Sequence, residues 1–356
     1  MDRLKAIADW LPNGRIGALV TAAVTRRYLT GFGEGGGIVI VTKEQCLYYT
    51  EAEHYEKAKQ TVSGCRVVMI KNLRLQLMEL MLNLNIRLLF IEPERMTVRE
   101  YTELSEAVHC AEIEMSGGMS EMLAQLRAVK SEEEIALIRR AQGIADAAYK
   151  RFLSSVRRGM TEKQAAALLS GYILECGADG VPFPVSAASG ENSALEHPKP
   201  TDRKLSVGDF LVLRFGAECG GYCSAVTRTI AVGEVGEVME DVYNAAAAAC
   251  SDAIAVIGAG RGCKLPYSVA KSTLNSWGGL DEHFGETLGC GIGAELNEEP
   301  WISRNSRGVL RSGMVVTVAP AVRIAGRFGV CIEDVTVVEE NGCEILSNAT
   351  KKLIHI

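Results

Sequence analysis

The chain of 356 residues is 47% hydrophobic and 23% charged, which is the composition of an ordinary globular protein with a large core. Its net charge of −6, without any basic run, argues against a nucleic-acid-binding surface. No apolar stretch is long enough to span a bilayer, and the first residues lack the apolar core of a secretion signal, so we expect a cytoplasmic protein. The 11 scattered cysteines contain no C-x-x-C pair and favour free thiols over a disulfide framework or a zinc ribbon.

The first third of the chain alternates short apolar runs with helical patterns. We expect strands at Gly17–Thr21, Gly37–Thr42, Cys46–Thr50, Arg66–Ile70 and Arg87–Ile91. Apolar residues at helical spacing predict helices at Glu51–Thr61 and Leu73–Leu84. This alternation predicts an α/β domain over residues 1–117.

A linker over residues 118–130, with a connecting helix at Ser120–Val129, leads into a second domain at 131–356. Capping boxes open two helices there, one at Ser131 with Glu134 and one at Thr161 with Gln164. The helix that starts at Thr161 is expected to end at about Glu175. Further helices are expected near Val235–Ile257 and Tyr267–Trp277, and strands at Val309–Val318 and Val330–Val338.

Between these helices lies a stretch that organises the second domain. Gly208–Gly216 and Cys223–Thr229 are rich in β-branched and apolar residues, and the segment Glu218–Gly221 between them ends in a Gly pair. Two such runs joined by a Gly pair predict a β-hairpin.

This hairpin resembles the pattern GD-x-x-x-x-D-FG…YCSD-x-TRT of the prolidase, aminopeptidase P and creatinase superfamily. Two further segments carry the same resemblance: Tyr28–Phe32 reads YLTGF, and Leu126–Ser131 matches the superfamily's junction between domains. The resemblance implies a creatinase-like α/β N-terminal domain followed by an α+β pita-bread (creatinase/aminopeptidase) domain. Because many relatives are homodimers, we also expect a homodimer.

The superfamily holds two divalent metals such as manganese with Asp, Asp, His, Glu and Glu. Matching each motif to this chain places its five ligand positions at Arg214, Ala225, Cys290, Ala319 and Glu333. Only Glu333 is a family ligand. Two dications need several carboxylates, so we expect no metal cofactor, and we expect these five residues to line one cavity.

Neighbouring positions differ from the superfamily as well. Glu286 and Asn297 stand where it has histidines and Cys331 where it has an arginine, which makes all three candidates for lining the cavity. His197 matches the histidine of its A-L-P-H motif, so His197 and Glu333 are the remnant catalytic candidates. Cys290 could act as a nucleophile, but a small apolar residue filling the space of an imidazole is the favoured interpretation.

Three functions remain open. The first is a non-catalytic pseudo-peptidase whose former active-site cavity binds a small molecule or peptide, or is merely structural. The second is a metal-free, creatinase-like amide hydrolase using His197 and Glu333, although creatinase has a glutamate at Thr227 and keeps a histidine at Cys290. The third is a residual Xaa-Pro peptidase, which would need the metal to activate water.

The charge balance of the site gives one more expectation. Because Arg214 and Glu333 are the two charged groups left at the ligand positions, we expect an ion pair between them where the metals would stand. The competing interpretation is that Arg214 turns to solvent while Glu333 accepts hydrogen bonds from backbone amides.

Overall fold

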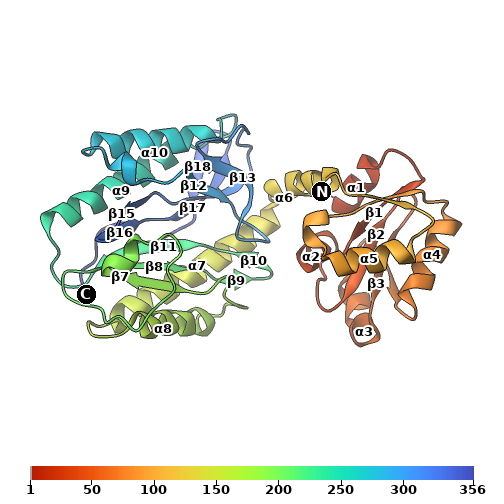
Figure 1. The fold of residues 1–356 in the computed structure, drawn as a ribbon, viewed down its shortest axis with the longest axis horizontal. Helices are drawn as coiled ribbons and strands as arrows, with labels where there is room; N and C mark the ends of the chain where they lie inside the picture. The colour runs from red at the N-terminus through yellow and green to blue at the C-terminus, as the bar shows by residue number, and fades with distance from the viewer. Residues whose placement is uncertain (1) are drawn as a thin grey trace. The chain divides into compact units, whose positions relative to one another are not determined.

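The computed structural model describes residues 2–356 and divides into two compact units, residues 1–126 and 127–356 (Figure 1). The division falls within a helix, α6 (Gly118–Ala128). Within the described part of the chain, no helix has the length and apolar character needed to cross a membrane. Each unit is described separately below.

The N-terminal unit is built on a six-stranded sheet in the order β4-β3-β2-β1-β5-β6. Strand β1 runs parallel to β5 and antiparallel to β2. The strands are β1 (Ile16–Val20), β2 (Gly37–Val41), β3 (Cys46–Thr50), β4 (Arg66–Met69), β5 (Leu88–Phe90) and β6 (Glu112–Glu114). The helices are α1 (Arg3–Trp10), α2 (Ala23–Thr30), α3 (Ala52–Thr61), α4 (Leu73–Asn83) and α5 (Val98–Ala107), with a short 3-10 turn, η1 (Pro93–Arg95).

Both faces of this sheet are buried. Ala18 and Val20 of β1 belong to one hydrophobic cluster, and Leu19 between them belongs to another, because successive strand residues point to opposite faces. The predicted α/β class and the five predicted strands are confirmed. Strand β6 was missed because its three residues, Glu-Ile-Glu, are too few to show a period.

Two cysteines of this unit correct the expectation of free thiols. Cys46 and Cys65 form a disulfide, with their Cα atoms 4.7 Å apart. Strands β3 and β4 are parallel neighbours in which Leu47 is opposite Arg66. Cys46 and Cys65, which precede these two residues, therefore lie side by side. Strand register, which the cysteine spacing does not reveal, brings the two sulfur atoms together. The other nine cysteines are free.

The C-terminal unit combines two main sheets with helices on their outer faces. One sheet has the order β11-β8-β7 and the other the order β13-β12-β14-β17-β18. The strands are β7 (Ser186–Ser189), β8 (Phe210–Phe215), β9 (Glu218–Cys219), β10 (Tyr222–Cys223), β11 (Val226–Ala231), β12 (Thr287–Gly291), β13 (Glu298–Ser303), β14 (Val315–Val318), β15 (Ala321–Ile324), β16 (Phe328–Cys331), β17 (Asp334–Glu339) and β18 (Gly342–Ile345). The helices are α7 (Glu132–Ser155), α8 (Glu162–Glu175), α9 (Glu237–Ala255) and α10 (Lys264–Ser276), with 3-10 turns η2 (Gly190–Ala194) and η3 (Leu280–His283).

The predicted hairpin and both predicted capping boxes are confirmed. Ser131 and Thr161 each accept a hydrogen bond from the backbone N–H three residues on, and Glu134 and Gln164 reach back to the cap. Two of the predicted strands are longer than the strands in the structure. Strand β14 begins only at Val315, after a turn at Gly313 with φ of 83°. The strand predicted at Val330–Val338 breaks at Ile332, where the chain passes from β16 to β17.

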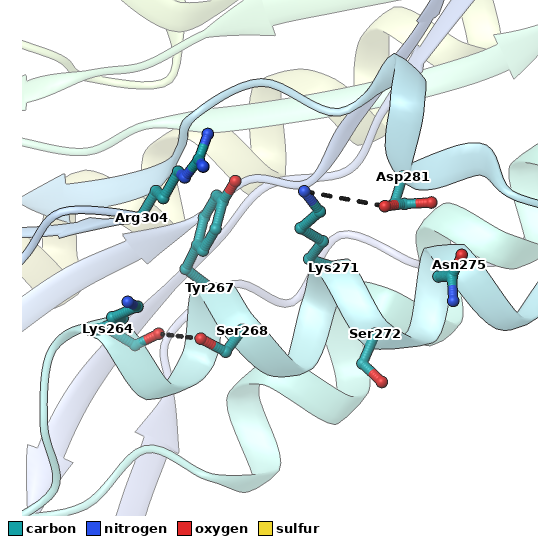
Figure 2. A pocket seen from close by; sticks show the side chains of 8 residues that line it. All are labelled: Lys264, Tyr267, Ser268, Lys271, Ser272, Asn275, Asp281 and Arg304. Atoms are coloured by element: carbon teal, nitrogen blue, oxygen red, sulfur yellow. Dashed lines mark hydrogen bonds and ion pairs between the residues drawn. The ribbon is translucent and has the colours of Figure 1, made fainter.

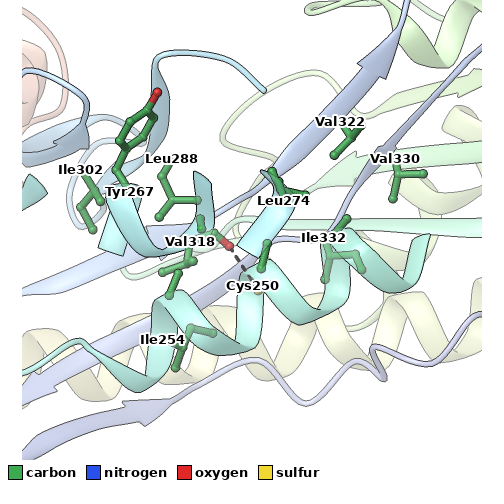
Figure 3. Packing of buried hydrophobic residues seen from close by; sticks show 14 of the residues in the cluster. Cys250, Ile254, Tyr267, Leu274, Leu288, Ile302, Val318, Val322, Val330 and Ile332 are labelled. Atoms are coloured by element: carbon green, nitrogen blue, oxygen red, sulfur yellow. Dashed lines mark hydrogen bonds between the residues drawn. The ribbon is translucent and has the colours of Figure 1, made fainter. Parts of the chain in front are cut away.

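Separate hydrophobic clusters hold the helices onto the sheets. Figure 3 shows Cys250 and Ile254 of α9 and Leu274 of α10 packed against residues of β12, β14 and β15. A second cluster joins α7 and α8 to the outer face of β8 and β11. The remaining face of the β11-β8-β7 sheet is therefore not covered by these two helices.

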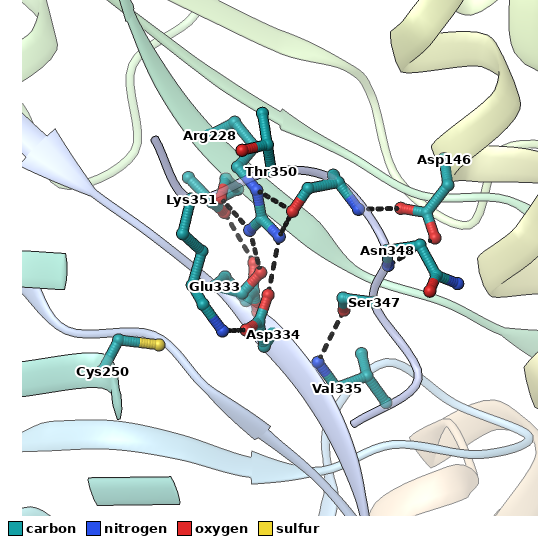
Figure 4. A network of polar contacts seen from close by, with 12 residues as sticks. Asp146, Arg228, Cys250, Glu333, Asp334, Val335, Ser347, Asn348, Thr350 and Lys351 are labelled. Atoms are coloured by element: carbon teal, nitrogen blue, oxygen red, sulfur yellow. Dashed lines mark hydrogen bonds and ion pairs between the residues drawn. The ribbon is translucent and has the colours of Figure 1, made fainter. Parts of the chain in front are cut away.

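A buried arginine links the two main sheets (Figure 4). The Arg228 guanidinium on β11 donates to Asp334 Oδ1 on β17 at 2.6 Å and to the Glu333 carbonyl. It also donates to the carbonyl of Ala349 at 2.7 Å, while Lys351 pairs with the other Asp334 oxygen. Arg228 and Asp334 each expose 1% of their side chains, so this pair is fully desolvated.

We expect Asp334→Ala to lower the free energy of unfolding of residues 127–356 by about 3–5 kcal/mol, because it leaves buried Arg228 without its counter-ion. The measurement is urea unfolding followed by fluorescence in a Trp10→Phe background, so that only Trp277 and Trp301 report. The matched control is Asp202→Ala.

The control removes an exposed ion pair, Lys163–Asp202, and should cost less than about 1 kcal/mol. Equal midpoints for the two variants would contradict a structural role for the buried pair.

Candidate functional site

One row of paired residues crosses the β11-β8-β7 sheet and continues onto the β16–β17 segment. Arg214 on β8 is opposite Ser186 on one side and Thr227 on the other. Thr227 forms a further antiparallel bridge with Glu333. Because directly paired residues project from the same side of a sheet, the Arg214, Thr227 and Glu333 side chains share one face.

The remaining expected ligand positions follow from register. Strand β14 pairs with β17 so that Val318 is opposite Asp334, and Ala319 and Glu333 are the residues next to this last pair. Cys290 lies on β12, and its N–H donates to Thr317 Oγ1 on β14 at 3.2 Å. Ala319 and Thr317 are two residues apart and share a face. Ala225 is fully buried and lies just before β11, two residues from Thr227.

Glu333 is held by Thr227, which the sequence analysis named only as the position of a creatinase glutamate. Its Oε2 accepts a hydrogen bond from Thr227 Oγ1 at 2.6 Å, and its N–H donates to the Thr227 carbonyl at 2.9 Å. Glu333 is 4% exposed. Thr227 lies in the TRT part of the hairpin motif, and only the pairing of β11 with residue 333 reveals this contact.

The expected Arg214–Glu333 ion pair is wrong. Within residues 2–356 the structure contains no such pair, and the Arg214 guanidinium lies over the Phe183 ring, 4.9 Å from its centroid. The competing interpretation also fails in part, because Glu333 accepts from a hydroxyl rather than from backbone amides. One strand, β11, lies between Arg214 on β8 and Glu333, and its Thr227 side chain takes the hydrogen bond to the Glu333 carboxylate.

Two thiols lie beside these charges. Burial, together with the Glu333 carboxylate, raises the pKa of the Cys290 thiol to about 11, and its Sγ donates to Asn297 Oδ1 at 3.3 Å. Burial and Glu333 raise the pKa of Cys331 to about 12, while the guanidinium groups of Arg323 and Arg214 act in the opposite direction. Neutral, desolvated thiols are poor nucleophiles, which agrees with a packing role for Cys290.

Three candidates lie toward the surface. His197 is exposed and follows η2, and the next residue, Pro198, accepts a hydrogen bond from Ser186 Oγ through its carbonyl. Asn297 is exposed apart from its contact with Cys290. Glu286 has a 71% exposed side chain paired with Arg304 at 3.3 Å, so the structure does not bring Glu286 to the Arg214–Glu333 row.

A buried ion pair near Cys290 was also missed. Lys130 Nζ lies 3.0 Å from Glu298 Oε2, and both side chains are almost completely buried. Arg127 pairs with Glu295 at 2.9 Å beside it. Lys130 belongs to the junction motif Leu126–Ser131 and Glu298 follows Asn297, and only the fold joins them across 168 residues.

Two pockets lie away from this row. A pocket of about 440 Å³ lies beside α10 and η3, where Figure 2 shows Lys271 directed at Asp281 and Arg304 beside Tyr267. A larger one of about 760 Å³ lies in the N-terminal unit between α4, α5 and the loops that precede β2 and follow β1. Neither contains any of the five expected ligand positions.

The two sheets, the hairpin at their junction and the preceding α/β unit define a creatinase-like protein with a pita-bread C-terminal domain, as the sequence predicted. The model of metallopeptidase family M24 matches residues 136–340, and that of the creatinase/prolidase N-terminal domain matches residues 3–129. The chain belongs to metallopeptidase family M24.

Individual relatives match over nearly the whole chain. The uncharacterized peptidase YqhT of Bacillus subtilis is 32% identical over 95% of each chain. An Xaa-Pro dipeptidase of Pyrococcus furiosus is 29% identical over 99% of each. The solved structure of an Xaa-Pro dipeptidase from Bacillus anthracis superposes with a TM-score of 0.93 and 32% identity, covering 99% of this chain and 98% of that one.

Because its pKa is about 11, Cys290 should resist alkylation by iodoacetamide at pH 8 in the native protein and react fully once the protein is unfolded. Peptide mass spectrometry after labelling measures both states. Cys110, which is partly exposed, is the internal control and should react under native conditions. Native labelling of Cys290 as fast as that of Cys110 would support a nucleophilic role instead.

Proposed function

We propose that this family member is a pseudo-peptidase, a non-catalytic protein that uses the site of its relatives' chemistry to bind a small molecule or peptide. The observation that supports this most directly is the row Arg214–Thr227–Glu333. Its one carboxylate is occupied by a threonine hydroxyl, and a guanidinium stands at the position expected to hold the first metal ligand.

The donor set does not fit a pair of divalent cations. The five positions offer one carboxylate, Glu333, and one thiol, Cys290. Arginine stays protonated and has no lone pair to offer a metal. A dication pair requires several oxygen ligands whose negative charge offsets its own, so neither the coordination nor the charge is provided.

The creatinase-like alternative finds less support. It requires His197 to exchange protons with a substrate close to Glu333, yet His197 is exposed and its side chain has no hydrogen bond within residues 2–356. The acidic partner that creatinase has at the position of Thr227 is a hydroxyl here, and that hydroxyl donates to Glu333.

The deciding experiment combines metal analysis with an activity assay. Purified protein is equilibrated with excess Mn²⁺, desalted and analysed by inductively coupled plasma mass spectrometry, and hydrolysis of Xaa-Pro dipeptides is followed with and without Mn²⁺. We expect less than stoichiometric metal and no hydrolysis. Stoichiometric metal that is lost in Glu333→Gln would support the residual peptidase, and metal-free turnover of an amide would support the creatinase-like enzyme.

A second prediction restores the family's ligands. The combined variant Arg214→Asp, Ala225→Asp, Cys290→His and Ala319→Glu should take up divalent metal, because it supplies again the carboxylates and the imidazole that two dications need. Each single variant should not, since one added ligand cannot hold two dications. Calorimetric titration with Mn²⁺ measures uptake. A folded combined variant without metal uptake would mean that the backbone geometry of the site has also changed.

A further inference from the structure

The Arg214 guanidinium is unusual among the buried or partly buried arginines of this unit. Arg228 satisfies its donors with a carboxylate and with backbone carbonyls. Arg214 is partly buried, yet within residues 2–356 it has neither an ion pair nor a hydrogen bond. Its contact with Phe183 covers one planar face of the guanidinium and leaves the edge that carries the N–H donors without a protein acceptor.

A second arginine without a protein acceptor, Arg323, lies near this row. On β15, Ala321 is opposite Cys331, and Arg323 is two residues further along, so it projects from the same side as Ala321. Cys331 is two residues from Glu333 along the chain, at the end of β16. Arg323 is partly buried and has no hydrogen bond or ion pair to the described chain. Both guanidiniums and the Glu333 carboxylate act electrostatically on the Cys331 thiol, so all three charged groups lie near it.

The fixed charges on this face leave a positive surplus. Glu333 is the carboxylate of the row; it is buried, accepts a hydrogen bond from Thr227, and forms an ion pair with neither arginine within residues 2–356. Two cations therefore face one anion that is already engaged. A partly desolvated guanidinium is stabilised by an acceptor with two oxygens in one plane, which carboxylates and phosphates supply.

We propose that this face binds a small oxyanion, a carboxylate or a phosphate, with Arg214 as the principal contact and Arg323 as the second. The proposal rests on the proposed function, since it assigns to an anion the place that the family gives to metal ions. It also identifies the class of ligand for the pseudo-peptidase: an acidic small molecule or the acidic group of a larger one.

The test is isothermal titration of the EDTA-treated full-length protein with succinate and with inorganic phosphate, and with neutral succinamide as the uncharged analogue. Arg214→Gln removes the principal contact, and Arg214→Lys keeps its charge without the planar donor edge. Arg323→Gln tests the second contact. Arg327→Gln is the matched control, because Arg327 is exposed at the turn between β15 and β16. Circular dichroism establishes that each variant is folded.

We expect at least one anion to bind and succinamide not to bind. Arg214→Gln should weaken binding on the order of 10- to 100-fold, the value of a charge-assisted hydrogen-bond pair. Arg214→Lys should weaken it less, Arg323→Gln should also weaken it, and Arg327→Gln should leave it unchanged. Binding of succinate alone or phosphate alone identifies the source of the oxyanion.

Absence of heat with both anions, or equal binding by wild type and Arg214→Gln, would overturn the oxyanion site. That failure is distinct from failure of the proposed function, because a protein without metal, hydrolysis or anion binding would still be a pseudo-peptidase with a structural site. If Arg214→Gln does not fold, Arg214→Lys and Arg323→Gln decide, and unchanged binding in both would overturn the proposal.

Discussion

The desolvated pair between Arg228 and Asp334 is the interaction on which the C-terminal unit depends. The two residues lie on strands of different sheets, and the same guanidinium also binds the carbonyls of Glu333 and Ala349. Removing these charges from water costs several kcal/mol each, and only a complete set of acceptors offsets that cost. The pair therefore fixes where β11 meets β17, and through that junction it fixes the backbone of Glu333.

The site is best understood as a consequence of this junction. Thr227 and Glu333 are the residues immediately before Arg228 and Asp334, and they project from the opposite side of their strands. The buried ion pair (Arg228 and Asp334) and the candidate site (Thr227 and Glu333) therefore lie on opposite sides of the same two chain segments. Changes on the site side, such as Arg214 and Ala319, leave the interactions of Arg228 intact. The contacts of Arg228 therefore join the two sheets independently of the side chains on the site side.

The N-terminal unit has its own core, its own disulfide and its own pocket. Its sheet is buried on both faces, and the Cys46–Cys65 bond joins β3 to the parallel strand β4. The 760 Å³ pocket lies at the edge where β1 and β5 end, which is the point at which the strand order reverses direction. Charged side chains around it, such as Arg74 with Glu106, are already paired with one another. No ligand is assigned to it for that reason.

The sequence by itself determined the two-part architecture, the central hairpin and the capping boxes at Ser131 and Thr161, because periodicity and capping are local properties. It also determined which residue types stand at the motif positions, from Arg214 to Glu333. Tertiary structure alone decided their partners. Thr227 rather than Arg214 binds Glu333, Lys130 pairs with Glu298, and Cys46 bonds to Cys65. Each of these contacts depends on strand register between segments distant in the chain, and register leaves no trace in the composition of either segment alone.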